Sequence, residues 1–163
     1  MSFRIVAFER DHAKRAFACG NAPLDRHWRE YAHQDLRRGI ATAHVLIENE
    51  TGTVAGYYTL SAASVTLQSL PLETRRKLPP YPQIPVALLG RLAVATAHKG
   101  QGFGALLVHD AATRVRASGV GCYAIVADPI DDAATAFYLH LGFLALKGER
   151  RSFAPLTALA SEL

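Results

Sequence analysis

Residues 99–104, Lys99-Gly100-Gln101-Gly102-Phe103-Gly104, decide the fold of this chain because they join an apolar strand to an amphipathic helix. The strand is predicted over residues 89–94 and the helix from about Ala105. Alternate glycines at such a junction allow positive φ and close approach of the backbone to a ligand. The first N–H groups of the helix have no partner within it and, with the helix dipole, suit a pyrophosphate. The spacing therefore predicts a phosphate-binding turn; the alternative is a tight connection that serves packing alone.

Two widespread phosphate loops do not fit this stretch. The Walker-type loop needs Lys and a hydroxyl residue after its last glycine, whereas Ala105 and Leu106 follow Gly104. The dinucleotide fingerprint GxGxxG belongs early in a βαβ unit, and here the spacing is GxGxG, late in the chain. The stretch instead resembles the acyl-coenzyme A loop of the GCN5-related N-acetyltransferase (GNAT) family, Arg/Gln-x-x-Gly-x-Gly/Ala. Lys99 stands where Arg or Gln is commoner, and Gly102 and Gly104 fill the two glycine positions.

A second block, after a strand predicted over residues 121–127, strengthens this resemblance. It is similar to the family's Asn-x-x-Ala-x-x-Phe-Tyr…Gly-Phe segment, with Asp131 where Asn is commoner. The matching residues are Asp131, Ala134, Phe137, Tyr138, Gly142 and Phe143.

The resemblance implies an α/β fold, with residues 1–163 as a single N-acetyltransferase domain. Its mixed central β-sheet would contain a splayed strand pair and be flanked by helices. It also implies acetyl-coenzyme A as co-substrate, no metal, and Tyr138 as the catalytic residue facing the thioester sulfur. The cofactor-binding residues would be Leu92, Ala93, Val94, Lys99, Gly100, Gln101, Gly102, Phe103, Gly104, Asp131, Ala134 and Phe137.

Three further segments, residues 56–61, 82–86 and 90–94, resemble one branch of that family, the acetyltransferase toxins of bacterial toxin–antitoxin pairs. Asn21, Leu24 and Asp25 near the start extend the likeness. Membership would imply acetylation of the α-amine of aminoacyl-tRNA, a ribbon-helix-helix antitoxin as partner, and pairing into a homodimer. Two alternatives stay open: a GNAT enzyme for a small-molecule amine or a protein or peptide N-terminus, and an acyl-CoA-binding interaction protein with little catalysis.

The positive charge is unevenly distributed along the chain. The net charge is +4, and residues 73–100 alone carry Arg75, Arg76, Lys77, Arg91 and Lys99 against one acidic residue. Before this segment eight basic residues nearly cancel seven acidic ones. A localised basic stripe attracts an RNA backbone, so we predict Arg75, Arg76, Lys77 and Arg91 as substrate or RNA contacts. The alternative is a solvated face for residues 75–77 and an acidic partner within the sheet for Arg91.

Composition bounds the class of protein. A chain of 163 residues, half of them hydrophobic, is large enough for one domain with a sizeable core. No apolar run has the length of a signal peptide or a membrane span, so we expect a cytoplasmic protein without a membrane partner. Cys19 and Cys122 are the only cysteines, and they give neither a disulfide framework nor metal-ligand spacing.

Local patterns predict the remaining elements. Asn21 caps a helix with Pro23 in its first turn, and a polar turn over residues 49–53 joins two strands at 44–48 and 54–62. Prolines exclude a regular helix from residues 70–85, which we interpret as an ordered loop beside the substrate. Further strands are predicted at 3–10, 143–146 and 151–156, and a helix at 132–141.

Acetyl transfer from a thioester needs a polarised carbonyl and a proton for the departing thiolate. In the splayed strand that the resemblance implies, we expect backbone N–H groups of residues 92–94 to polarise the carbonyl. The hydroxyl of Tyr138 has the chemistry of a general acid. The alternative for Tyr138 is a core aromatic packed beside Phe137. The sequence offers no comparable candidate for a general base.

Overall fold

The computed structural model describes residues 2–159. The predicted domain covers 1–163, so residue 1 and residues 160–163 lie outside the described part. Contacts divide the chain into two compact units: unit 1 is Met1–Ser61 with Arg91–Ala111, and unit 2 is Ala62–Gly90 with Ala112–Leu163. Each unit is described by itself below.

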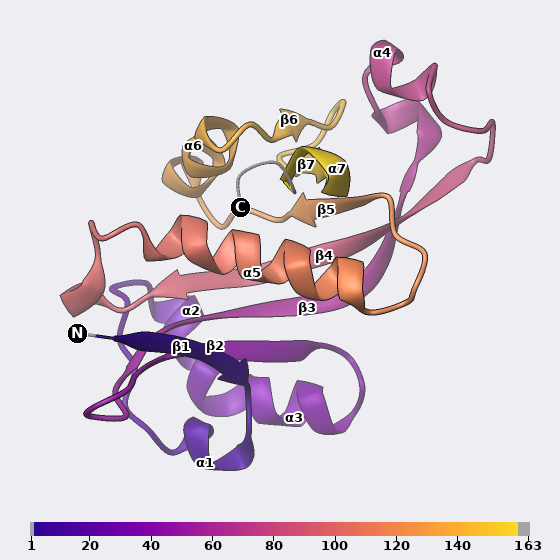
Figure 1. Ribbon diagram of the computed structural model, residues 1–163. Coiled ribbons are helices and arrows are strands. Elements are labelled where there is room, and N and C mark those ends of the chain that lie inside the picture. Colours follow the sequence, from indigo (N-terminus) through magenta and orange to yellow (C-terminus); the bar gives the residue numbers. More distant parts are fainter. Residues whose placement is uncertain (1, 160–163) are drawn as a thin grey trace. The chain divides into compact units, whose positions relative to one another are not determined.

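Seven strands form one mixed sheet in the order β1-β2-β3-β4-β5-β7-β6 (Figure 1). The pairs β1–β2, β2–β3, β5–β7 and β6–β7 are antiparallel, whereas β4 and β5 are parallel. This confirms the predicted α/β class with a mixed sheet. The strands are β1 Phe3–Ala7, β2 Thr42–Glu48, β3 Val54–Thr66, β4 Gln83–Val94, β5 Ala124–Ala127, β6 Leu144–Ala145 and β7 Ser152–Pro155.

Unit 1 is built on a helical segment packed on β1, β2 and the first part of β3. The segment runs through α2 (Ala22–Arg26), a π-helical turn η1 (His27–Tyr31) and α3 (Ala32–Arg37). Asn21 begins it as predicted, because its side chain accepts the N–H of Leu24 at 3.1 Å and proline fills the first turn. Trp28 is fully buried in the core of this unit, where its indole N–H donates to the carbonyl of Arg15 at 3.0 Å.

Strand lengths differ from the prediction where tertiary pairing overrides local sequence. Strand β1 ends at Ala7, because the short helix α1 (Arg10–Ala13) begins where the strand was expected to continue. Strand β3 runs on to Thr66 rather than ending at residue 62. The predicted turn at 49–53 is confirmed, with the N–H of Gly52 donating to the carbonyl of Glu48 at 2.9 Å.

Unit 2 has a smaller core, formed where β5 pairs with the first half of β4 and with β7. Helix α6 (Asp132–His140) agrees closely with the prediction, and α7 (Leu156–Leu159) was not predicted. Strands β5, β6 and β7 are each shorter than expected. Helix α5 (Phe103–Ala117), like β3 and β4, continues from one unit into the other.

The proline-rich segment contains more regular structure than predicted. A 3-10 turn η2 (Leu67–Ser69) and a short helix α4 (Leu72–Arg75) precede its four closely spaced prolines, and β4 already begins at Gln83. Pro85 is accommodated in the strand because its carbonyl, which proline retains, accepts the N–H of Tyr123 at 2.9 Å.

No helix among residues 2–159 combines the length and apolar character needed to cross a membrane. Both cysteine thiols are free, and burial raises the pKa of each. Within the described residues no group of three His, Cys, Asp or Glu side chains is arranged to hold a metal ion.

Candidate active site

The glycine-rich loop of unit 1 lies between a 3-10 turn η3 (Thr96–His98) and helix α5. Gly100 and Gly102 have φ of +79° and +80°, a conformation in which side chains are strained. A Cβ built on either glycine would meet nothing within 4 Å, so open space adjoins the loop on that side. The conformation and the space agree with a loop that receives a ligand against its backbone.

Helix α5 begins at Phe103, two residues before the predicted start. Its first backbone bond runs from the N–H of Leu106 to the carbonyl of Gly102 at 3.2 Å. The N–H groups of residues 103–105 precede that bond and are not used within the helix. With the positive end of the helix dipole, these donors fit the pyrophosphate of coenzyme A.

Lys99 ties the loop to the N-terminal part of unit 1. Its ammonium donates to the carbonyl of Cys19 at 2.6 Å, and the N–H of Cys19 donates to Asp25 Oδ1 at 2.9 Å. An ammonium has three donors, so Lys99 keeps two for a ligand. Lys99 therefore positions the loop in addition to its predicted role as a phosphate donor.

The backbone N–H and C=O groups of β4 switch from one edge of the strand to the other next to Gly90. The carbonyl of Leu89 accepts the N–H of Asp128, which follows β5, whereas the N–H of Arg91 donates to Thr59 Oγ1 on β3 at 3.0 Å. In a regular strand residues two apart direct their backbone groups to the same edge. One extra residue, a β-bulge, therefore lies between Leu89 and Arg91.

Beyond the bulge, β4 presents alternate N–H groups away from β3. Arg91 and Ala95 direct theirs toward β3, the latter to the carbonyl of Ala55 at 2.8 Å. The N–H groups of Leu92 and Val94 therefore point to the opposite edge, while Ala93 faces β3. Pairing of β4 with β5 ends at Leu89, which is what the predicted splayed strand pair requires. Of the three predicted carbonyl-polarising residues, Leu92 and Val94 have the suitable direction.

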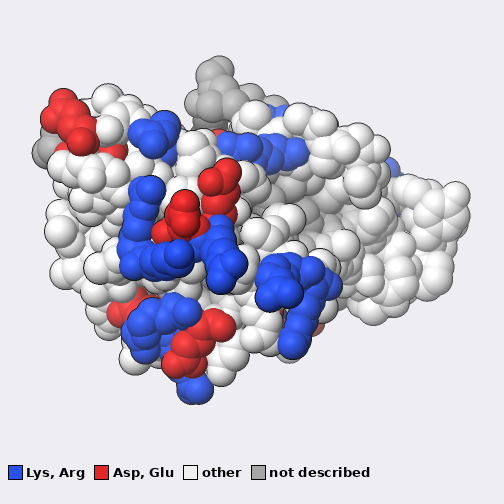
Figure 2. All heavy atoms as spheres, turned by 90° about the horizontal axis from the view of Figure 1, so that it is seen from below, with Lys and Arg blue, Asp and Glu red and all other residues white. Residues whose placement is uncertain are grey.

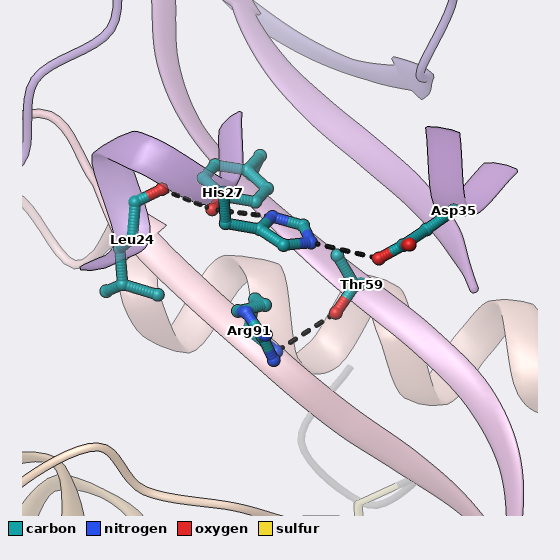
Figure 3. A network of polar contacts seen from close by, with 6 residues as sticks. Leu24, His27, Asp35, Thr59 and Arg91 are labelled. Atoms are coloured by element: carbon teal, nitrogen blue, oxygen red, sulfur yellow. Dashed lines mark hydrogen bonds and ion pairs between the residues drawn. The ribbon is translucent and has the colours of Figure 1, made fainter. Parts of the chain in front are cut away.

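Arg91 is exposed on β4. Its guanidinium makes no hydrogen bond or ion pair within residues 2–159, so the acidic partner considered from the sequence is absent there. The positive charge of Arg91 acts on His27 of η1, whose pKa is lowered first by burial and then by Arg91 (Figure 3). Arg91 thus leaves an uncompensated charge on the strand that carries Leu92 and Val94.

His27 belongs to a polar network that the sequence analysis did not find. His27 Nδ1 lies 3.2 Å from the Tyr57 hydroxyl, which donates to the carbonyl of Leu24 at 2.8 Å, and His27 Nε2 lies 3.4 Å from Asp35 (Figure 3). Both rings are buried. Spacing alone gave no signal, because these residues meet only when η1 packs on β3.

In unit 2, Tyr138 lies on α6 and is buried between Phe137 and Phe143, with ring centroids 5.1 and 5.2 Å away. Burial, reinforced by Asp128, raises the pKa of its hydroxyl, so the group keeps its proton at neutral pH. Among the described residues nothing hydrogen-bonds this hydroxyl, which leaves it available as a donor.

The other predicted residues of unit 2 have local roles that the structure makes visible. Asp131 is the N-cap of α6, and its carboxylate accepts the N–H of Ala134 at 2.8 Å. Aspartate serves this cap as well as the commoner asparagine does. Arg75 and Arg76 are partly engaged, Arg75 with Gln68 at 2.8 Å and Arg76 with Glu73 at 3.2 Å. Both arginines and Lys77 lie at the end of α4 or just after it.

The structure thus brings one group of predicted residues together within unit 1, namely the loop at 99–104, residues 92–94 and Arg91. The second group belongs to unit 2 and comprises Asp131, Ala134, Phe137 and Tyr138 on or beside α6, and Arg75, Arg76 and Lys77 at α4.

The model of the acetyltransferase (GNAT) family matches residues 8–143, a span that includes the loop, the bulged strand and α6. The chain belongs to the GNAT family. As a member of this family, the protein is an acetyltransferase that uses acetyl-coenzyme A. The loop at 99–104 has a geometry suited to this coenzyme.

Within the GNAT family, the chain is similar to toxins that acetylate tRNA. The chain is 35% identical to a tRNA-acetylating toxin of Mycobacterium tuberculosis over 130 residues, which is 78% of this chain and 76% of that protein. Among solved structures, AtaT complexed with acetyl-methionyl-tRNAfMet superposes with a TM-score of 0.87 at 30% identity, covering 98% of both chains. A tyrosine-to-phenylalanine mutant of AtaT, bound to acetyl-CoA and the C-terminus of the antitoxin AtaR, has a TM-score of 0.79 at 27% identity, covering 99% of this chain and 97% of that one.

Proposed function

We propose that this protein transfers the acetyl group of acetyl-coenzyme A to the α-amine of aminoacyl-tRNA, as the toxin of a toxin–antitoxin pair. The observation that carries the proposal is the loop at 99–104 in unit 1, with two positive-φ glycines, unused helix N–H groups and adjoining open space. The acceptor is chosen from the tRNA-acetylating relative and the AtaT complex, which this chain matches over most of its length.

Each part of the chemistry has a residue suited to it. Acetyl-coenzyme A supplies a thioester whose carbonyl must be polarised and whose sulfur must be protonated on departure. The N–H groups of Leu92 and Val94 are proposed to donate to the carbonyl oxygen as it gains charge. Tyr138 is proposed to hold the proton that the departing sulfur receives, because its raised pKa keeps the hydroxyl protonated.

The remaining assignments concern the two substrates. Phe103, Gly104 and Lys99, with Gly100, Gln101 and Gly102, are proposed to bind the coenzyme pyrophosphate, and Ala134 and Phe137 its pantetheine arm, with Asp131 capping α6 beside them. Arg91 is proposed to contact phosphate near the reactive end of the tRNA, since its charge is uncompensated in the described residues. Arg75, Arg76 and Lys77 are proposed as weaker contacts, because two of them already have polar partners.

The biological setting follows from the acceptor. We infer that the reaction takes place in the cytoplasm, where aminoacyl-tRNA is used, and that residues 1–163 work as one catalytic domain. A ribbon-helix-helix antitoxin is the proposed partner, supported by the AtaR-bound relative, and a homodimer is the proposed assembly.

A cell-free translation reaction tests the proposal. Charged tRNA treated with the protein and acetyl-coenzyme A is expected to stop supporting translation, whereas treatment without acetyl-coenzyme A leaves it competent. Full translation after both treatments would contradict the toxin function. Acetylation of a peptide N-terminus or a small amine in a parallel assay would then assign the enzyme to that acceptor.

A further inference from the structure

Five cationic side chains of unit 1 surround a hollow of about 510 Å³ beside α1, η1 and α3. Figure 2 views the protein from this side and shows Lys and Arg side chains gathered around a few acidic ones. The charged side chains that line the hollow are Arg10, Lys14, Arg29, Arg37 and Arg38, with Glu30 the one acidic residue.

Helix geometry aligns these side chains into two ridges. Arg29, His33 and Arg37 follow one another at intervals of four along η1 and α3, and Glu30, Gln34 and Arg38 do the same beside them. Residues four apart lie on one helical face, about 6 Å apart along the axis. Helix α1 packs next to α3 and supplies the facing wall. Arg29 and Arg37 are the cations of one ridge, two turns apart with His33 between them, and Arg38 is the cation of the other.

Most of this charge is uncompensated. Within residues 2–159, the side chains of Arg10, Arg29, Arg37 and Arg38 have no hydrogen bond or ion pair. The carboxylate of Glu30 is already engaged, because Arg26 donates to it at 2.8 Å from outside the lining, and this hydrogen bond lowers the pKa of Glu30. Like charges gathered around one hollow repel one another, and a bound polyanion would relieve that repulsion.

The lining favours nucleic acid over an acidic protein segment. A protein partner normally anchors itself by apolar side chains at the centre of the interface, and Ala13 is the one apolar residue that lines the hollow. Arginine forks bind phosphate in bidentate fashion, and Gln34 and His33 add neutral polar groups, with His33 Nδ1 buried and unbonded in the described residues. The hollow thus offers many phosphate donors and almost nothing for a peptide to pack against.

We propose that the hollow of α1, η1 and α3 binds the sugar–phosphate backbone of tRNA and so contributes to substrate affinity away from the reacting amine. The inference rests on the proposed function for its choice of RNA. It adds a phosphate-binding surface to the contacts already proposed for Arg91 on β4 and for residues 75–77. It also assigns the N-terminal helices a role in substrate binding.

Binding of deacylated bulk tRNA, followed by fluorescence anisotropy over a range of salt concentrations, tests this site. In the variant Arg29→Gln/Arg37→Gln/Arg38→Gln the slope of log K against log salt is expected to become shallower by about two to three. The control, Lys147→Gln/Arg150→Gln/Arg151→Gln, removes the same charge from unit 2 and is expected to keep the wild-type slope. Glutamine preserves helix propensity at the exposed Arg29, Arg37 and Arg38. Lys147, Arg150 and Arg151 lie outside helices, and Arg150 and Arg151 form ion pairs, so circular dichroism of both variants checks that they fold.

Steady-state kinetics separate this inference from the proposed function. If charged tRNA is the acceptor, the hollow variant should raise KM for it roughly tenfold or more and leave kcat nearly unchanged. A wild-type protein that does not acetylate charged tRNA would overturn the proposed function, whatever the binding slopes. A hollow variant with the wild-type salt slope would overturn the tRNA-binding hollow, even if acetylation is confirmed. If this variant lost binding to polyglutamate but kept the wild-type salt slope for tRNA, the tRNA-binding hollow would also be overturned. The hollow would then be assigned to an acidic protein partner.

Discussion

His27 and Tyr57 lie face to face, with ring planes 2° apart and His27 Nδ1 3.2 Å from the Tyr57 hydroxyl. The Tyr57 proton is committed to the carbonyl of Leu24, so its oxygen accepts from His27 Nδ1–H. This chain of hydrogen bonds fixes η1 against β3 in the interior of unit 1. The same η1 carries Arg29 of the basic hollow, so the packing of one turn supports a predicted binding surface.

Replacing Tyr57 by Phe should reduce the free energy of unfolding by about 1 to 3 kcal/mol, because the Leu24 carbonyl and the His27 ring lose a buried partner. Urea denaturation followed by circular dichroism measures the change. Tyr31→Phe is the matched control: its hydroxyl accepts from Arg26 at an exposed position and should change stability by no more than about 0.5 kcal/mol. Equal effects of the two substitutions would show that the buried network contributes nothing.

His27 should make the protein less stable in mild acid. Burial and Arg91 lower its pKa below the ordinary value of 6.5, so the folded state binds this proton less readily than the unfolded state. The contribution of His27 to the free energy of unfolding is therefore fully present above pH 6.5 and is lost as the pH falls through the lowered pKa. Unfolding free energies of the wild type and His27→Gln, measured from pH 8 to pH 5, should show a shallower decline in the variant. His12, whose pKa burial also lowers, keeps its contribution in both proteins.

Gly102→Val should abolish coenzyme binding, since a branched side chain would occupy the open space beside the loop and strain a residue at φ +80°. Gly119→Val provides a control with φ +78° and equally open surroundings, but outside the loop. Both variants lose stability through the same strain, so only the binding isotherm separates them. Calorimetry that finds acetyl-coenzyme A bound with normal affinity by Gly102→Val would reject the pyrophosphate assignment.

Tyr138→Phe should lower kcat by about 10²- to 10⁴-fold while leaving the affinity for acetyl-coenzyme A nearly unchanged, because only a proton donor is removed. Tyr123→Phe, at a half-buried tyrosine of unit 2, should leave both quantities unchanged. Full activity in Tyr138→Phe would show that Tyr138 is a core aromatic residue and not the proton donor.

Local sequence rules predicted those parts of the fold that depend on a few neighbouring residues. Asn21 begins its helix through a cap within three residues, and the glycines at 100 and 102 take positive φ for local reasons. The cap by Asp131 is equally local but was not predicted, because Asp131 was interpreted only as a cofactor contact. The extent of β4 and its bulge were not predicted. They depend on partners such as Thr59 and Asp128, which are distant in sequence.

The hollow lined by five cations was not predicted either, because net charge along the sequence does not show which side chains meet in space. Eight basic and seven acidic residues before residue 73 nearly cancel in the sequence. In the structure five of those eight line the hollow, with only Glu30 of the seven. Intervals of four between Arg29, His33 and Arg37 were visible in the sequence, but the facing wall from α1 depends on tertiary packing.

Transfer of radiolabelled acetyl from acetyl-coenzyme A tests the central claim most directly, with charged bulk tRNA, the same tRNA deacylated, and a panel of small amines and peptides as acceptors. Label that appears on charged tRNA alone, and is released with the amino acid when the ester is hydrolysed, is the predicted result. Label on small amines or peptides with none on charged tRNA would contradict the account.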